Sequence, residues 1–112
     1  MTATLTDAPL TVNALRYTLL AACMMHVEGF YSMNSLAFKN CNPGNLENPD
    51  GSMRKWGDVI GGYSALVRDI QVNGGKPLAT FIAKYAPPNE NNTSMYLEVV
   101  SHLSGIGKDE LL

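Results

Sequence analysis

An apolar run with helical spacing ends abruptly at Glu28-Gly29, and this feature most constrains how the chain can fold. Its apolar positions recur one helical turn apart at Leu15, Leu19, Ala22 and Met25. Helix-starting residues lie between Asp7 and Thr11, so we expect one long helix from there to Glu28. Gly29 fits the position just past a helix end, where a left-handed backbone is common.

The placement of Glu28 is chemically unusual. An acid at the C-terminus of a helix is repelled by the helix dipole, so other groups must hold it there. The same repulsion favours the protonated form. A carboxyl group that is partly desolvated beside a cleft has a raised pKa, which suits it to general acid catalysis. We therefore take Glu28 as the candidate catalytic residue; the alternative is a solvated residue at a helix end.

The remaining pattern predicts an α+β fold that is mainly helical, with a small β-hairpin after the first long helix. The turn signal Asn48-Pro49-Asp50-Gly51 lies between Leu46 and Ile60, where periodicity is weak. A short irregular or helical turn is expected over 31–38. Three further helices are expected over about 63–72, from Pro77 to just before Pro87, and from Asn92 or Thr93 to Ser104. A chain of 112 residues has the length of a single domain, 1–112.

Several short segments carry a resemblance to a known family. They are Glu28-Gly29, the run Asn42 to Leu46, Trp56-Gly57, and the segment Tyr85 to Thr93 followed by Tyr96. In order and spacing they resemble the lysozyme-like superfamily, in particular small phage and prophage muralytic domains similar to lytic transglycosylases and goose-type lysozymes. The resemblance implies cleavage of the β-1,4 bond between N-acetylmuramic acid and N-acetylglucosamine in peptidoglycan, with Glu28 as general acid/base.

A second carboxylate is less clearly marked. Glycoside hydrolysis normally uses two carboxyl groups, and the expected hairpin offers Glu47, Asp50 and Asp58. Asp50 is the named candidate, although an Asp in a Pro-Asp-Gly turn commonly serves the turn itself. Goose-type lysozymes and lytic transglycosylases work with one essential Glu, and this sequence looks more like them. Whether the products are those of a hydrolase or of a transglycosylase stays open.

The resemblance also implies residues that contact the glycan. Asn42 and Asn45 can present amide groups to sugar hydroxyls and N-acetyl groups, and both also suit a turn. Trp56 is a candidate to stack on a sugar face, or else a core residue. Tyr96 is expected to hydrogen-bond Glu28 or the substrate. Glu90 lies in the segment that the family places over the cleft, and we expect it to fix local backbone or contact substrate.

Composition limits the partners. The formal charge of −2 and the lack of a Lys/Arg cluster argue against nucleic acid. An anionic wall polymer would be helped by a basic patch around Arg54 and Lys55. Neither Cys23 and Cys41 nor the two histidines have the spacing of a zinc site, and two free thiols are favoured over a disulfide. We expect no metal or organic cofactor, no membrane span and a monomer that acts on peptidoglycan strands.

The sequence leaves open how the protein reaches the cell wall and whether it is an enzyme. Met1 to Leu10 has no basic region before an apolar stretch, so no Sec signal is recognisable. We expect synthesis in the cytoplasm and action at the cell wall or periplasm, reached through virion packaging, a holin lesion, a secretion system or a fusion partner. The alternatives to an enzyme are an inactive wall-glycan-binding or structural component of the same fold, and a protein-interaction domain.

Overall fold

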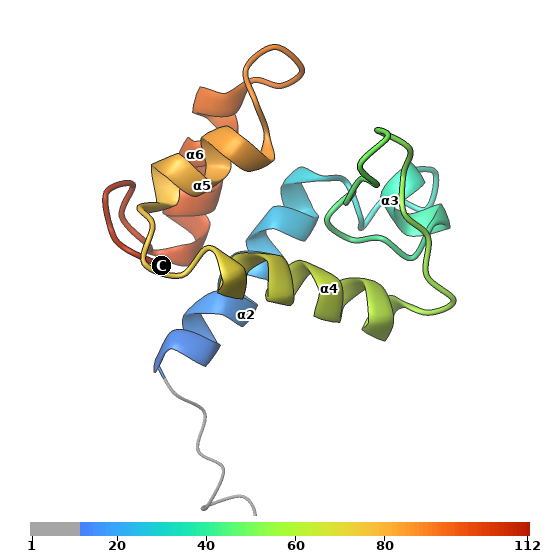
Figure 1. The fold of residues 1–112 in the computed structure, drawn as a ribbon, viewed down its shortest axis with the longest axis horizontal. Coiled ribbons are helices and arrows are strands. Elements are labelled where there is room, and N and C mark those ends of the chain that lie inside the picture. The colour runs from blue at the N-terminus through green and yellow to red at the C-terminus, as the bar shows by residue number, and fades with distance from the viewer. Residues whose placement is uncertain (1–11) are drawn as a thin grey trace, which may run out of the picture.

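The computed structural model describes residues 12–112, and this part of the chain is mainly helical, as the sequence predicts (Figure 1). Its helices are α2 (Val12–Val27), α3 (Leu36–Lys39), α4 (Val59–Val72), α5 (Leu78–Tyr85) and α6 (Thr93–Ser104). The expected start of the first helix, between Asp7 and Thr11, lies outside the described residues. Within residues 12–112, β-pairing is confined to two isolated antiparallel bridges, Glu47 with Met53 and Pro77 with Leu111.

The end of α2 is built as the sequence predicts. The N–H of Gly29 donates to the carbonyl of His26 at 3.2 Å, and that of Phe30 to the carbonyl of Met25 at 3.0 Å. Gly29 has a φ of +77°. This pair of bonds around a left-handed glycine is a Schellman motif, which satisfies the last carbonyls of a helix. The motif leaves Glu28 as the last residue before the chain turns away.

A loop and a small hairpin follow α3, and the side chain of Asn42 joins them. Its Nδ2 donates to the carbonyls of Leu46 and Arg54, both at 2.9 Å, and its Oδ1 accepts from the N–H of Leu46 at 2.9 Å. The hairpin itself has the single bridge between Glu47 and Met53. The side chain of Asn42 thus supplies hydrogen bonds that a longer ladder would otherwise provide.

Helix α4 begins at Val59, earlier than the start near Tyr63 that the sequence indicated. Asp58 caps it, because its Oδ1 accepts from the N–H of Gly61 at 2.8 Å. Gly61 and Gly62 disfavour a helix by propensity, which is why this first turn could not be recognised from the sequence. Asp58 is therefore the N-cap residue of α4.

Two glycines allow the loop after α3 to pack closely against the helices. A Cβ on Gly62 would lie 1.9 Å from the carbonyl oxygen of Cys41, and one on Gly44 would lie 2.6 Å from Oη of Tyr85. Neither position can take a side chain without movement of the backbone or of a packed neighbour. The loop that carries the Asn-Pro-Gly-Asn run is thereby held between α4 and α5.

The last two helices follow their sequence signals closely. Helix α5 starts directly after Pro77. Asn92 caps α6 through a bond from the N–H of Met95 to its Oδ1 at 3.1 Å, and Gly105 ends α6 with a φ of +76°. The predicted boundaries of α6 are confirmed, whereas Pro77 lies at the N-cap of α5 and not in its first turn.

Helix α2 is central: it packs against both α4 and α6, and α6 in turn packs against α5. Its residues Leu20, Ala21 and Met24 are fully buried. In Figure 1 the helices α5 and α6 lie on one side of α2, and the loop and hairpin around α3 lie on the other. None of the helices in residues 12–112 has the length and apolar character needed to cross a bilayer. The arrangement places the end of α2 between two lobes.

Candidate functional site

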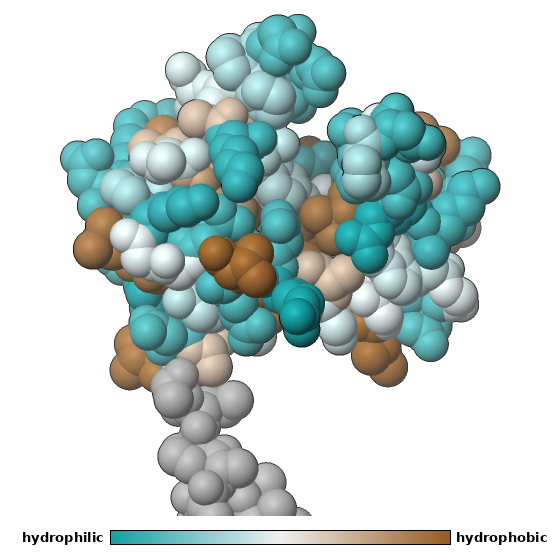
Figure 2. Space-filling view, in the orientation of Figure 1, coloured by the Kyte–Doolittle hydropathy of each residue, from teal (hydrophilic) through white to brown (hydrophobic). Residues whose placement is uncertain are grey.

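A cleft of about 460 Å³ lies between the hairpin and the segment that links α5 to α6. The space-filling view is hollowed between these two lobes (Figure 2). The cleft is lined by residues from the end of α2, the loop and hairpin, α4, α5 and the segment after α5: Glu28, Asn45, Leu46, Glu47, Met53, Asp69, Lys84, Tyr85, Pro87, Glu90 and Asn91. Most of these side chains carry hydrogen-bonding groups, so the cleft suits a polar ligand.

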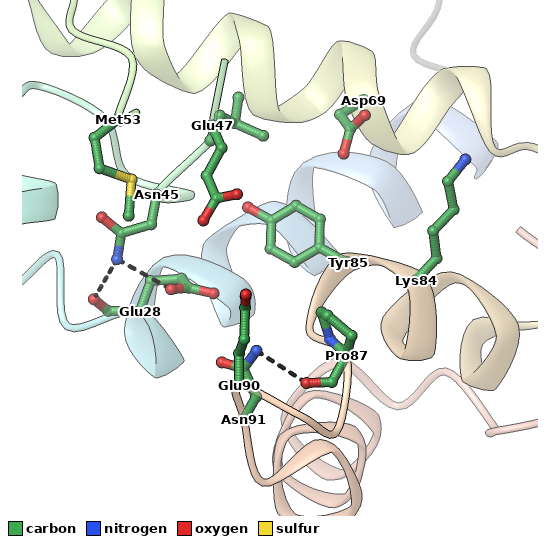
Figure 3. Close-up of a pocket in the computed structure, with 11 residues that line it drawn as sticks. Glu28, Asn45, Glu47, Met53, Asp69, Lys84, Tyr85, Pro87, Glu90 and Asn91 are labelled. Carbon is green, nitrogen blue, oxygen red and sulfur yellow. Dashed lines mark hydrogen bonds between the residues drawn. The ribbon is translucent and has the colours of Figure 1, made fainter. Parts of the chain in front are cut away.

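Glu28 enters this cleft from the end of α2 and is held by two side-chain donors. The hydroxyl of Tyr96, on α6, donates to Oε2 at 2.8 Å, and Glu28 is one of the two partners expected for this tyrosine. Nδ2 of Asn45 donates to Oε1 at 3.0 Å and approaches the Glu28 carbonyl at 3.4 Å (Figure 3). Each carboxyl oxygen thus has its own donor, and the two donors fix the side chain in one orientation.

Asn45 reaches Glu28 because the loop adopts a left-handed turn there. Its φ is +50°, a conformation that Asn tolerates better than most residues. Its Oδ1 is buried and has no hydrogen-bond partner among the described residues. An unpaired buried acceptor costs about 1–3 kcal/mol. The amide is therefore oriented so that its Nδ2 bonds to Glu28, which leaves its Oδ1 without a partner among the described residues.

Burial raises the pKa of Glu28 above its ordinary value, while the bonds from Asn45 and Tyr96 oppose that shift. The negative end of the α2 dipole acts in the same direction as burial. Burial, together with the charge of Glu28, also holds the pKa of Tyr96 far above its usual range, so this phenol stays a donor. The site therefore contains a carboxyl group that can hold a proton and two neutral donors ready for its anion.

Tyr85, at the end of α5, is a site residue that the sequence analysis did not single out. Its hydroxyl donates to the carbonyl of Gly44, and its ring stands in the cleft between Glu28 and Asp69 (Figure 3). Its pKa is raised well above the usual value, first by burial and then by the charge of Glu28. Tyr85 opens the segment that carried the family resemblance, and only the packing of α5 on the loop gives it a role.

Asn42 does not have the position expected of a glycan contact. It is fully buried, and all three of its hydrogen bonds go to the backbone of the loop and hairpin. No polar atom is left to face the cleft. Its role is to hold the hairpin in place.

Trp56 also lies outside the cleft lining. It is half-buried beside the hairpin, and the guanidinium of Arg54 lies 4.5 Å from the centre of its ring. This geometry is a cation–π contact. The indole therefore serves the hairpin and Arg54, and the expected stacking on a sugar in the cleft is not supported by its position.

Asp50 is at the exposed tip of the hairpin and is not part of the cleft lining. Its Oδ1 accepts from the N–H of Ser52 at 2.9 Å and from the Ser52 hydroxyl at 2.6 Å. These two bonds lower its pKa. Asp50 is thus a turn residue, and its position outside the cleft lining does not support its candidacy as a second catalytic carboxylate.

Two other acids, Glu47 and Glu90, do line the cleft. Glu47 comes from the hairpin and Glu90 from the opposite lobe, where its neighbour Asn91 donates to the carbonyl of Pro87 at 3.3 Å. Both side chains extend toward the space beside Glu28 (Figure 3). Glu90 was expected near the cleft, whereas nothing in the local sequence separated Glu47 from Asp50.

Comparison with known proteins assigns no family to this chain. No family model matches the chain, and neither the curated proteins nor the solved structures contain a match. Within residues 12–112 no three His, Cys, Asp or Glu side chains are grouped to hold a metal ion. Cys23 is buried and Cys41 half-buried, and both are free thiols. The chemistry that the site can perform therefore depends on Glu28 and its neighbours.

Proposed function

We propose that this chain is a lysozyme-like glycosidase that cleaves the β-1,4 bond between N-acetylmuramic acid and N-acetylglucosamine in peptidoglycan. The observation that carries the proposal is the state of Glu28. It is a partly buried carboxyl group with a raised pKa, it has one donor on each oxygen, and it faces an open polar cleft. This combination is what general acid catalysis of glycoside cleavage needs.

In the proposed reaction Glu28 protonates the leaving sugar oxygen. As it loses its proton, negative charge develops on its two oxygens. The hydroxyl of Tyr96 and the amide of Asn45 are already in place to stabilise that charge, so little reorganisation is needed. Their bonds to Glu28 are stronger to the anion than to the acid, and they therefore favour the transition state over the bound substrate.

Two courses are open for the second half of the reaction. In a hydrolase, a water molecule attacks the sugar with help from a carboxylate, and Glu47 and Glu90 are the acids beside Glu28 that line the cleft. In a lytic transglycosylase, the anion of Glu28 takes the proton from the 6-hydroxyl of the substrate, which closes an anhydro ring. The transglycosylase needs no second acid.

The test is incubation of purified sacculi with the protein and with the Glu28→Gln variant, followed by mass analysis of the soluble fragments. Gln keeps the shape of the side chain and can still hydrogen-bond Asn45 and Tyr96, but it cannot donate a catalytic proton. We expect fragments from the parent and none from the variant, with equal far-UV circular dichroism. Anhydro ends would assign a transglycosylase and reducing ends a hydrolase.

Two results would overturn the enzyme assignment. One is full release of fragments by Glu28→Gln. The other is a folded parent protein that sediments with sacculi and releases nothing, which would replace the enzyme with a wall-binding or structural component of the same fold.

A further inference from the structure

A second hollow lies beside the cleft and is called here the arginine cavity. Its volume is about 270 Å³, and it is lined by Leu46, Arg54, Ala65, Arg68, Asp69 and Val72. Leu46 and Asp69 also line the cleft, so the two hollows share a wall. In Figure 3 Asp69 lies on the far side of Tyr85 from Glu28. The arginine cavity therefore adjoins the end of the cleft that is remote from the catalytic acid.

The two arginines of this cavity come from different elements. Arg54 follows the hairpin and Arg68 lies on α4, so packing, and not sequence proximity, brings them to one hollow. Both residues are exposed, and neither forms an ion pair with any other residue that the structure describes. The ring of Trp56, 4.5 Å from the Arg54 guanidinium, holds one of the two cations in place. Two unpaired guanidinium groups around one hollow are suited to an anion.

The lining of the cleft is mainly acidic, in contrast to that of the arginine cavity. Its lining has four carboxyl groups and one ammonium group, namely Glu28, Glu47, Asp69 and Glu90 against Lys84. The arginine cavity has two guanidinium groups against the single carboxyl group of Asp69. The positive charges of Lys84 and Arg54 act on Asp69 and oppose the rise in its pKa that burial causes. An anionic substituent is thus repelled along the cleft and attracted at its Asp69 end.

We propose that the arginine cavity binds a carboxylate of the stem peptide, while the sugar that carries this peptide lies in the cleft. The inference rests on the proposed function and deepens it, because it defines the substrate as glycan that bears acidic peptides. Arginine suits this role, since its planar fork can donate two parallel hydrogen bonds to one carboxylate. The segregation of charge also explains how a slightly acidic chain can bind an anionic polymer.

The test measures binding by calorimetry in the Glu28→Gln background, so that the probes are not cleaved. The probes are the disaccharide of N-acetylglucosamine and N-acetylmuramic acid with its lactyl carboxyl group amidated, the same disaccharide with its tetrapeptide, and that tetrapeptide form with its carboxylates amidated. We expect the acidic tetrapeptide form to bind about tenfold or more tighter than the other two. Arg54→Gln and Arg68→Gln should each remove most of this preference and leave the affinity for the bare disaccharide unchanged.

Lys55→Gln is the matched control, because Lys55 is an exposed cation beside Arg54 that does not line the cavity. Arg68→Gln is the safer of the two arginine variants, since Arg54 also contacts Trp56. Equal affinity for the three probes, or a preference that survives loss of both arginines in a folded protein, would overturn the inference. Loss of the same size in Lys55→Gln would also overturn it, because the effect would then be one of net charge.

Failure of the inference is distinguishable from failure of the proposed function. If sacculi are cleaved through Glu28, and glycan stripped of peptide by an amidase is cleaved equally well, the function stands and the arginine cavity has no role. If the bare disaccharide does not bind and sacculi are not cleaved, the proposed function falls and the inference falls with it.

Discussion

The segments around Glu28 and Asp50 share a local sequence pattern but differ in their surroundings. Each is a carboxylate followed by a glycine in the left-handed conformation, with φ of +77° at Gly29 and +88° at Gly51. Glu28 is covered by the loop and by α6, whereas Asp50 projects from a hairpin tip where nothing lies within 4 Å of a Cβ placed on Gly51. Burial raises the pKa of Glu28, and two bonds from Ser52 lower that of Asp50. The same two-residue pattern gives a candidate acid in one place and a turn in the other, because only one of them is desolvated.

The largest expected effect separates these two carboxylates by activity. Glu28→Gln should reduce the release of soluble wall fragments by about 100-fold or more, the usual scale of a lost general acid. Asp50→Asn should stay within about twofold of the parent, since Asp50 is outside the cleft. The measurement is the initial rate of fragment release at equal protein concentration. A loss of activity in Asp50→Asn comparable to that in Glu28→Gln would refute the contrast.

A smaller effect is expected from Tyr96→Phe. The change removes the donor to Oε2 of Glu28, which should lower activity about tenfold, the scale of a hydrogen bond to a charged group. The bond from Tyr96 lowers the pKa of Glu28, so its loss should raise that pKa further. The descending, high-pH limb of the pH–rate profile should therefore move to higher pH.

Tyr63→Phe is the matched control for this change. The Tyr63 hydroxyl donates to the carbonyl of Thr18 at 2.9 Å and lies outside the cleft lining. Its removal should leave the pH profile unchanged. A high-pH limb that stays in place in Tyr96→Phe would show that this tyrosine does not act on Glu28.

Asn45 can be tested for its two roles separately. Asn45→Gly keeps the left-handed turn but removes the donor to Oε1, so we expect activity to fall about fivefold with little loss of stability. Asn45→Ala removes the donor and also strains the turn, which should cost about a further 1 kcal/mol in the free energy of unfolding. Chemical denaturation of the two variants measures this difference. Equal stability of the Gly and Ala variants would mean that the turn is not strained by a side chain.

The pH dependence of stability should have opposite signs for Glu28 and for Asp50. The folded pKa of Glu28 is raised, so its contribution to stability is full below the unfolded value near 4.5 and is lost as the pH rises through the folded pKa. The melting temperature of Glu28→Gln minus that of the parent should therefore be a few degrees more positive at pH 7 than at pH 4. Melting curves across this range measure the difference. A constant gap between the variant and the parent would show that the carboxyl group is not desolvated.

The smallest effect is that of Asp50→Asn on stability. The folded pKa of Asp50 is lowered, so its contribution is present above the unfolded value near 3.8 and is lost as the pH falls through the folded pKa. The variant should melt slightly below the parent at pH 7, and the gap should close as the pH falls below the unfolded value and through the folded pKa. Because Asp50 is exposed to solvent, the difference should shrink in high salt. A gap that widens toward low pH would contradict the sign.

The sequence by itself determined the features that depend on near neighbours. The end of α2 at Gly29, the Asn92 cap of α6 and the Gly105 stop all follow from residues within one turn of each other. The helix start at Val59 was missed because the low helix propensity of Gly61 and Gly62 masked it, and their small size is needed only where the loop packs on α4.

Only the tertiary structure decided which side chains share the cleft. Tyr96 meets Glu28 across 68 positions of sequence, and Tyr85 meets Gly44 across 41. Packing also buried Asn42, left Asp50 in solvent and brought Arg68 beside Arg54. A cap is fixed by one hydrogen bond between residues three apart, whereas desolvation of a carboxylate depends on every segment folded over it. The sequence could therefore indicate that Glu28 ends a helix, and only the fold could bury its carboxyl group and so raise its pKa.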